Sequence, residues 1–103
     1  MYIVKRTIEM APGIAPADAL AAAVQIGAYV TNKQGMNTKT AVNVGGFQHE
    51  IHWVVMVDSL DSLPVTTAER EADDEWQQLT APFNEAGLFK PGSIRDEILM
   101  VIG

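Results

Sequence analysis

The order of strand-like and helix-like patterns along the 103 residues constrains the fold most strongly. Apolar and polar residues alternate as in a strand near the N-terminus, twice in the middle of the chain and again at its end. Helical periodicity fills the two long gaps between these segments. The predicted strands are residues 2–10, 36–44, 47–57 and 93–102, and the predicted helices are residues 16–34 and 66–87. With right-handed crossovers, this β-α-β-β-α-β order gives an α+β, ferredoxin-like fold: a four-stranded antiparallel sheet in the order 4-1-3-2, with both helices on one face.

Glycine, proline and capping residues predict where several elements end. Gly35 is placed to stop the first helix. The Gly45-Gly46 pair predicts a two-residue hairpin turn between the second and third strands. In the second helix, residues 66–69 form a capping box, and Pro82 predicts a kink or break near residues 80–81. The first helix carries no charge between Asp18 and Lys33, so we expect more than one of its faces to be covered.

Composition narrows the class of protein. A chain of 11.2 kDa suits one domain, which we expect to span residues 1–103. Because there is no cysteine, disulfides, thiolate catalysis and iron–sulfur clusters are excluded. A net charge of −6, with no basic cluster longer than Lys5-Arg6, argues against nucleic acid as a partner.

The sequence lacks the patterns typical of a membrane span or a secretion signal. The longest stretch of low charge, residues 19–32, is shorter than the roughly 20 apolar residues that cross a bilayer. The N-terminal residues alternate and do not form the basic start and apolar run of a secretory signal. We therefore expect a cytoplasmic protein with no membrane partner.

The two faces of the predicted sheet differ in apolar content. The face formed by the even residues of the first and last strands and the odd residues of the third is more apolar and should lie under the helices. The opposite face still carries Val54, Met56, Leu99 and Val101. Monomers seldom expose such a patch, so we expect a second copy to cover it, sheet against sheet, about a two-fold axis.

This pattern resembles the dimeric α+β barrel superfamily, which includes antibiotic-biosynthesis-type monooxygenases, small polyketide cyclases, muconolactone isomerases and haem-degrading oxygenases. The resemblance covers nearly the whole chain. It rests on the element order, the Gly45-Gly46 pair, the strand over residues 51–57 that runs into Asp58, and a second helix that carries Trp76. It implies a homodimer with a pocket for a small molecule, but a shared fold does not by itself transfer a reaction.

Polar residues on the apolar, helix-facing side are the candidate site. Arg6, His49 and Asp96 have this phase, and in the predicted strand order Arg6 can reach Asp96. One interpretation is structural: an ion pair plus a histidine at the sheet edge. The other is a pocket in which Arg6, His49 and Asp96 are catalytic, with His49 as the proton carrier. Its walls would be aromatic and would bind the substrate: Trp53, Trp76, Tyr29 and Phe83.

We expect neither a metal nor another cofactor at this site. His49 and His52 are three residues apart on a predicted strand, so their side chains leave opposite faces and cannot share an ion. No phosphate-binding glycine pattern is found in the sequence. The haem-degrading relatives bind haem through a histidine on the second helix, and the second helix predicted here contains none.

Two functions from different classes follow. The first is a homodimeric, cofactor-free enzyme that acts on a small aromatic or polyketide-like substrate, either as a monooxygenase or as a cyclase or isomerase that transfers protons. The alternative is a non-catalytic homodimer that binds a small ligand or provides an interaction surface. Open space beside the polar residues would favour the enzyme, and side chains that fill that space would favour the alternative.

Overall fold

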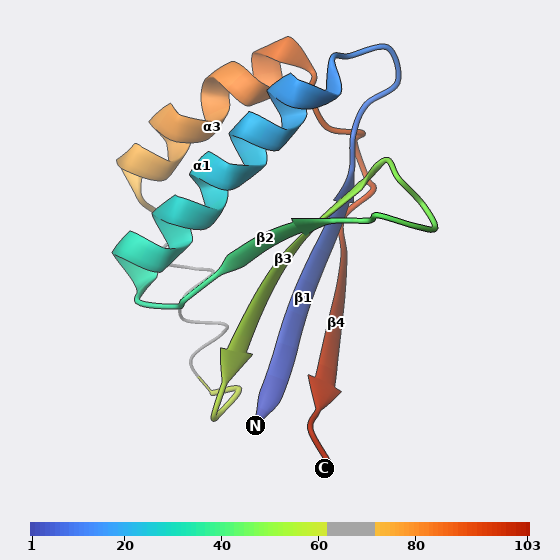
Figure 1. Ribbon diagram of the computed structural model, residues 1–103. Helices are drawn as coiled ribbons and strands as arrows, with labels where there is room; N and C mark the ends of the chain where they lie inside the picture. Colours follow the sequence, from blue (N-terminus) through green and yellow to red (C-terminus); the bar gives the residue numbers. More distant parts are fainter. Residues whose placement is uncertain (62–71) are drawn as a thin grey trace.

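The computed structural model describes residues 1–61 and 72–103 and contains the predicted sheet with two helices (Figure 1). Its strands pair antiparallel in the order β2-β3-β1-β4, which confirms the predicted fold class and strand order. The strands are β1 (Tyr2–Glu9), β2 (Lys39–Val42), β3 (Glu50–Val57) and β4 (Arg95–Met100), and the helices are α1 (Pro16–Gln34) and α3 (Asp74–Ala86).

Helix α1 begins and ends where the sequence predicts. Pro16 occupies the first turn, and Gly35 ends the helix in the left-handed conformation, with φ of 67°. Gly27 lets the helix approach the sheet closely, because a Cβ atom at this position would lie 2.5 Å from Thr40 Oγ1. Helix α1 packs on the sheet with one side and on α3 with another, which confirms the prediction that more than one of its faces is covered, while the side that includes Val24 is exposed.

The connection between β2 and β3 is longer than predicted. Val42 pairs with Ile51, so residues 43–50 lie outside the pairing between β2 and β3. The prediction of a two-residue turn at Gly45-Gly46 is therefore wrong. The Asn43 side chain explains the difference, because its Nδ2 donates to the Phe47 carbonyl at 2.7 Å and holds a wider loop. The register differs from the predicted one by two residues, so every strand residue keeps its predicted face.

Helix α3 begins later than predicted. The Asp73 side chain caps it by accepting from the Glu75 backbone N–H at 2.9 Å, whereas the predicted capping box at residues 66–69 lies outside the described residues. The sequence predicted a kink or a break near residues 80–81, and of these two the break is absent. Pro82 lies inside a continuous helix, where it removes one backbone hydrogen bond while the turns on either side remain helical.

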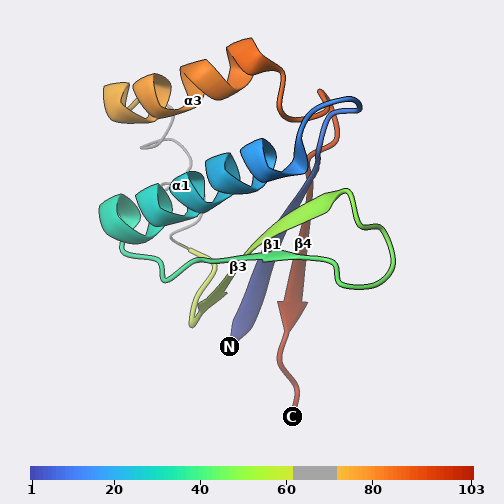
Figure 2. The ribbon, with the colours of Figure 1, turned by 45° about the horizontal axis from the view of Figure 1, so that its top comes forward.

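The helices lie in a layer over one face of the sheet. Helix α1 packs on β2 and β3, and α3 packs on α1 (Figure 2). The buried core lies between α1 and the central strands and comprises Ile8, Ala19, Ala23 and Ile51. No residue of α3 is buried. Because the core sits under α1, a hollow remains between α3 and the sheet.

Candidate functional site

A cavity of about 520 Å³ lies between the sheet and the two helices. Strands β1, β3 and β4 supply its floor, while α1 and α3 supply its walls. Most of its surface is apolar. Its apolar lining includes Trp53, Val55, Ile98, Trp76, Phe83 and Phe89. The volume falls within the range of about 300–1,000 Å³ that is usual for small-molecule sites.

The floor of this cavity carries an ion pair between Arg6 and Asp96. The two residues are paired across β1 and β4, and they are joined at two points: Nε donates to Oδ1 at 2.8 Å and Nη2 donates to Oδ2 at 2.9 Å. This hydrogen-bonded contact raises the pKa of Arg6, so its guanidinium stays charged. Their side chains are 36% and 47% exposed, so the pair lies at an open part of the cavity.

Arg6 has hydrogen-bonding capacity beyond this pair. A guanidinium has five N–H donors, and Asp96 accepts two of them. Within residues 1–61 and 72–103, the other three have no hydrogen-bond acceptor. Asn84, on α3, is a further polar residue that lines the cavity. An oxygen-bearing ligand would therefore find donors inside a mainly apolar space.

The aromatic walls are held by contacts behind them. The Trp53 indole N–H donates to the Ala23 carbonyl of α1 at 2.9 Å, which fixes the ring against the helix where Gly27 leaves room. Trp76 packs on Tyr29, with ring centroids 5.2 Å apart. The rings are thus oriented by the scaffold before any ligand binds, which lowers the entropic cost of binding.

Five of the seven predicted site residues line the cavity: Arg6, Asp96, Trp53, Trp76 and Phe83. Tyr29 does not. It is buried between the helices, where its hydroxyl donates to Asp73 Oδ2 and its ring supports Trp76. Its role in the structure is therefore to position the wall.

His49 also lies outside the cavity. Because β3 begins at Glu50, the alternation on which its predicted position depended does not extend to residue 49. Instead its side chain, 52% exposed, reaches Glu9 with 2.8 Å between Nε2 and Oε1. The structure therefore does not bring His49 together with Arg6 and Asp96.

Two polar residues of α3 that line the cavity were not predicted. Thr80 and Asn84 follow Trp76 at intervals of four residues, so they lie on the same side of the helix. This spacing was a signal available in the sequence. Phe89, which follows the helix, was also missed, and its ring lies 6.5 Å from that of Trp53.

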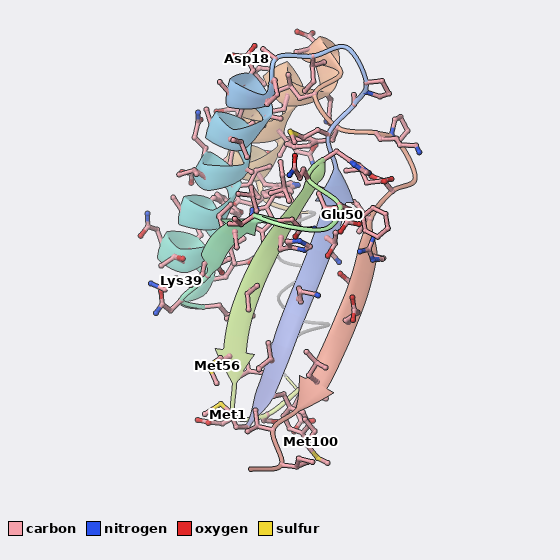
Figure 3. All side chains as sticks on the ribbon, turned by 45° about the vertical axis from the view of Figure 1, so that its right-hand side comes forward. Met1, Asp18, Lys39, Glu50, Met56 and Met100 are labelled. Carbon is pink, nitrogen blue, oxygen red and sulfur yellow. The ribbon has the colours of Figure 1, made fainter. Side chains whose placement is uncertain are left out.

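The opposite face of the sheet carries a different polar cluster, which the sequence did not reveal. Thr7 Oγ1 lies 2.8 Å from His52 Nδ1, and His52 Nε2 lies 2.6 Å from Asn43 Oδ1. Next to them, Arg95 pairs with the buried Glu50 at 2.7 Å. Figure 3 shows Glu50 beside the loop that joins β2 to β3. Burial is the main reason that the pKa of His52 is lowered.

No arrangement of three or more histidine, aspartate or glutamate side chains suited to a metal ion is present in the described part of the chain. Over the same residues, no helix is both long and apolar enough to cross a membrane.

Comparisons with known proteins show that the chain shares its fold with several solved structures. No protein-family model matches the sequence, and the curated proteins give no match. Among solved structures, an uncharacterized NIPSNAP domain protein from Burkholderia xenovorans is 16% identical, with a TM-score of 0.74 over 99% of this chain and 95% of that chain. A NIPSNAP family protein from Agrobacterium tumefaciens is 16% identical, with a TM-score of 0.70 over 98% of this chain and 85% of that one. The chain shares a ferredoxin-like α+β fold with these structures.

A third solved structure with the same fold is named for an activity. It is a proposed antibiotic biosynthesis monooxygenase from Chloroflexus aurantiacus, 18% identical, with a TM-score of 0.59 over 99% of this chain and 93% of that chain. The predicted resemblance to dimeric α+β barrels is thereby confirmed. At this level of identity the likeness concerns the fold, and the chemistry must be argued from the cavity itself.

Proposed function

We propose that this chain is a cofactor-free enzyme that binds a small aromatic or polyketide-like molecule in the cavity between the sheet and the helices. The observation that carries the proposal is a mainly apolar cavity whose floor presents a charged Arg6 with donors left over after pairing with Asp96. Aromatic walls suit a flat ligand, and a fixed cation suits an oxygen that becomes negative.

The residues support chemistry through a ligand anion. A phenol or a 1,3-dicarbonyl compound loses a proton to become a phenolate or an enolate, and the carboxylate of Asp96 lies in the cavity to accept that proton. Arg6 then stabilises the negative oxygen. Return of the proton to another atom gives isomerisation. Attack of the enolate carbon on a carbonyl carbon of the same molecule gives cyclisation, in which the carbonyl π bond opens and its oxygen takes the proton held by Asp96. Reaction of the anion with dioxygen gives oxygenation: one oxygen atom becomes a carbonyl of the product and the other leaves as water, with the substrate supplying the electrons. Oxygenation is the activity for which the Chloroflexus protein is named.

Anthrone is a suitable first substrate because it enolises readily. Two readings are needed: exchange of its acidic C–H protons with deuterated water, and consumption of oxygen. We expect catalysis of at least one, a loss of at least about 100-fold in Arg6→Met, and little change in His49→Gln. Saturable binding without either reaction would favour the alternative, a non-catalytic ligand-binding domain.

We also propose that two copies associate through the sheet face that the helices leave open. The half of this face farther from Glu50 exposes Met56, Leu99 and Val101, and Ile3 is half-buried beside them. Exposed apolar side chains gathered on one face are typical of an interface, and a two-fold axis would bury both patches at once. Light scattering should give twice the monomer mass, and Leu99→Asp should give the monomer. Val24→Asp, on the exposed face of α1, is the matched control.

A further inference from the structure

Helix α3 is attached to the rest of the molecule in different ways at its two ends, and we propose that it is a lid over the cavity, hinged at Gly87 and latched at Asp73. The passage of a ligand under the lid rests on the proposed function, whereas the movement itself does not.

The C-terminal end of α3 is anchored in the sheet. Leu88 is buried, and its carbonyl accepts from the Ala11 backbone N–H at 2.9 Å. Two residues further on, the Lys90 backbone N–H donates to the Glu9 carbonyl at 2.9 Å. Phe89 forms a β-bridge with Met10 between these bonds. This end of the helix is therefore fixed by backbone hydrogen bonds to the end of β1 and the residues after it.

The N-terminal end of α3 is held by side chains of α1. The Tyr29 hydroxyl donates to Asp73 Oδ2, and Lys33 Nζ lies 2.6 Å from Glu75 Oε2. The lysine and glutamate side chains are about half exposed, a setting in which an ion pair contributes little to stability. The latch thus includes this ion pair, the tyrosine–aspartate hydrogen bond and the packing of Trp76 on the buried Tyr29 ring.

The body of the helix shows the packing expected of a lid. None of its residues is buried, and its close packing is against α1, while the space between it and the sheet is the cavity. The side of α3 that lines the cavity carries Trp76, Thr80, Phe83 and Asn84. An outward swing of α3 would uncover the cavity and would break no contact of the buried core around Ile8 and Ile51.

Gly87 is suited to be the hinge. It adopts a left-handed conformation with φ of 62°, and a Cβ atom there would have no neighbour within 4 Å. A glycine in open space can change its backbone dihedral angles without a steric cost. Gly87 also lies directly between the loosely held helix and the anchored Leu88. Rotation at this residue breaks the hydrogen bond from the Leu88 backbone N–H to the Phe83 carbonyl, which is 3.3 Å long, and moves the helix while the anchor stays in place.

Amide hydrogen exchange tests the movement without any ligand. In Tyr29→Phe, which removes one hydroxyl group, we expect the amides of α3 to exchange about 10-fold faster as a group, with the amides of β1 and β3 unchanged. Tyr2→Phe is the matched control and should leave α3 unchanged. The lid is refuted if α3 keeps its exchange rate in Tyr29→Phe, or if all elements exchange faster together, since that reports global stability.

A chemical tether tests ligand access. The chain has no cysteine, so Lys33→Cys combined with Glu75→Cys creates two unique sites that a short bis-maleimide can join. The probe is a dihydroxyanthraquinone, and its binding is followed by stopped-flow measurement of the fluorescence of Trp53 and Trp76. Relative to the untethered double variant, the tether should slow both association and dissociation at least about 10-fold, because α3 must open for either.

The outcomes separate the lid from the proposed function. Unchanged association and dissociation rates in the tethered protein contradict the lid and leave the binding function standing. If the untethered protein does not bind the probe at all, the proposed function fails for this class of ligand. The amide hydrogen exchange of Tyr29→Phe then tests the movement of the lid independently of any ligand.

Discussion

Arg6 and Thr7 are neighbours in β1, but they occupy two very different polar environments. Arg6 points to the helix side, where its pair with Asp96 is half exposed and leaves donors over in an apolar cavity. Thr7 points to the other side, is fully buried, and joins His52 and Asn43 in a chain of hydrogen bonds. One change of face along a strand thus separates the two clusters.

The two clusters differ in what they leave available to a ligand. In the Thr7 cluster the side chains hydrogen-bond to one another, Thr7 is buried, and His52 and Asn43 are partly buried, so the cluster has little to offer a ligand and would be costly to disrupt. In the Arg6 pair the stabilisation is small because water screens it, but donors remain for a ligand. We therefore expect substitutions at Arg6 to change function and substitutions at Thr7 to change stability.

The largest expected effect is on catalysis in Arg6→Met. Loss of the cation that faces the anion should lower turnover of anthrone by about 100- to 1,000-fold. The free energy of unfolding should change by less than about 1 kcal/mol, because the pair is half exposed. Lys5→Met removes an ion pair with Glu97 on the other face and is the matched control. Equal losses of turnover in the two variants would contradict the assignment of the helix side of β1 as the functional side.

Thr7→Val should have the opposite profile. Valine has nearly the same shape but cannot hydrogen-bond to His52, so we expect a loss of about 1–3 kcal/mol in the free energy of unfolding. Urea denaturation measures this loss, and titration with the anthraquinone probe should give an unchanged Kd. A stable Thr7→Val protein with weakened ligand binding would reverse our assignment of the two faces.

A smaller effect concerns pH. Burial lowers the pKa of His52 from its usual 6.5, so the unfolded chain takes up a proton first as the pH falls below that value. The free energy of unfolding should therefore decrease from about pH 6.5 downward. The hydrogen bond from Arg95 lowers the pKa of Glu50, so a further decrease should begin near its ordinary pKa of 4.5 as the unfolded carboxylate is protonated.

Urea denaturation at several pH values checks this sign. His52→Gln should flatten the part of the curve just below pH 6.5, whereas Thr7→Val should lower stability at every pH. Direct titration of the His52 ring by NMR gives an independent reading. A pKa above 6.5 would show that the cluster stabilises the charged imidazole and would contradict the picture of a shielded, neutral network.

The sequence predicted the parts of the molecule that depend on local pattern and strand order. Pro16 and Gly35 delimit α1 correctly. Alternation in β1 and β4, combined with the order of the strands, places Arg6 opposite Asp96 as expected. This prediction succeeded because both residues lie well inside their strands, where side chains alternate strictly between faces.

The failures arose from side-chain hydrogen bonds, some within a loop or helix turn and some between distant residues. The bond from Asn43 to the Phe47 carbonyl opens the loop and removes His49 from the strand pattern. Asp73 caps α3 and also accepts a hydrogen bond from the Tyr29 hydroxyl, although no local pattern had marked Asp73 as the start of a helix. The Thr7 cluster likewise draws on three strand or loop segments whose register must be known before its members can be placed together.

The most direct test of the central claim is a ligand titration followed by two-dimensional proton–nitrogen NMR. The dihydroxyanthraquinone probe should shift the Nε–H signal of Arg6 and the indole N–H signals of Trp53 and Trp76 in a saturable manner. The backbone amides of Asn43 and His52, on the other face, should keep their positions. Saturable shifts that appear at Asn43 and His52 while Arg6 stays unchanged would contradict the assignment of the cavity as the functional site.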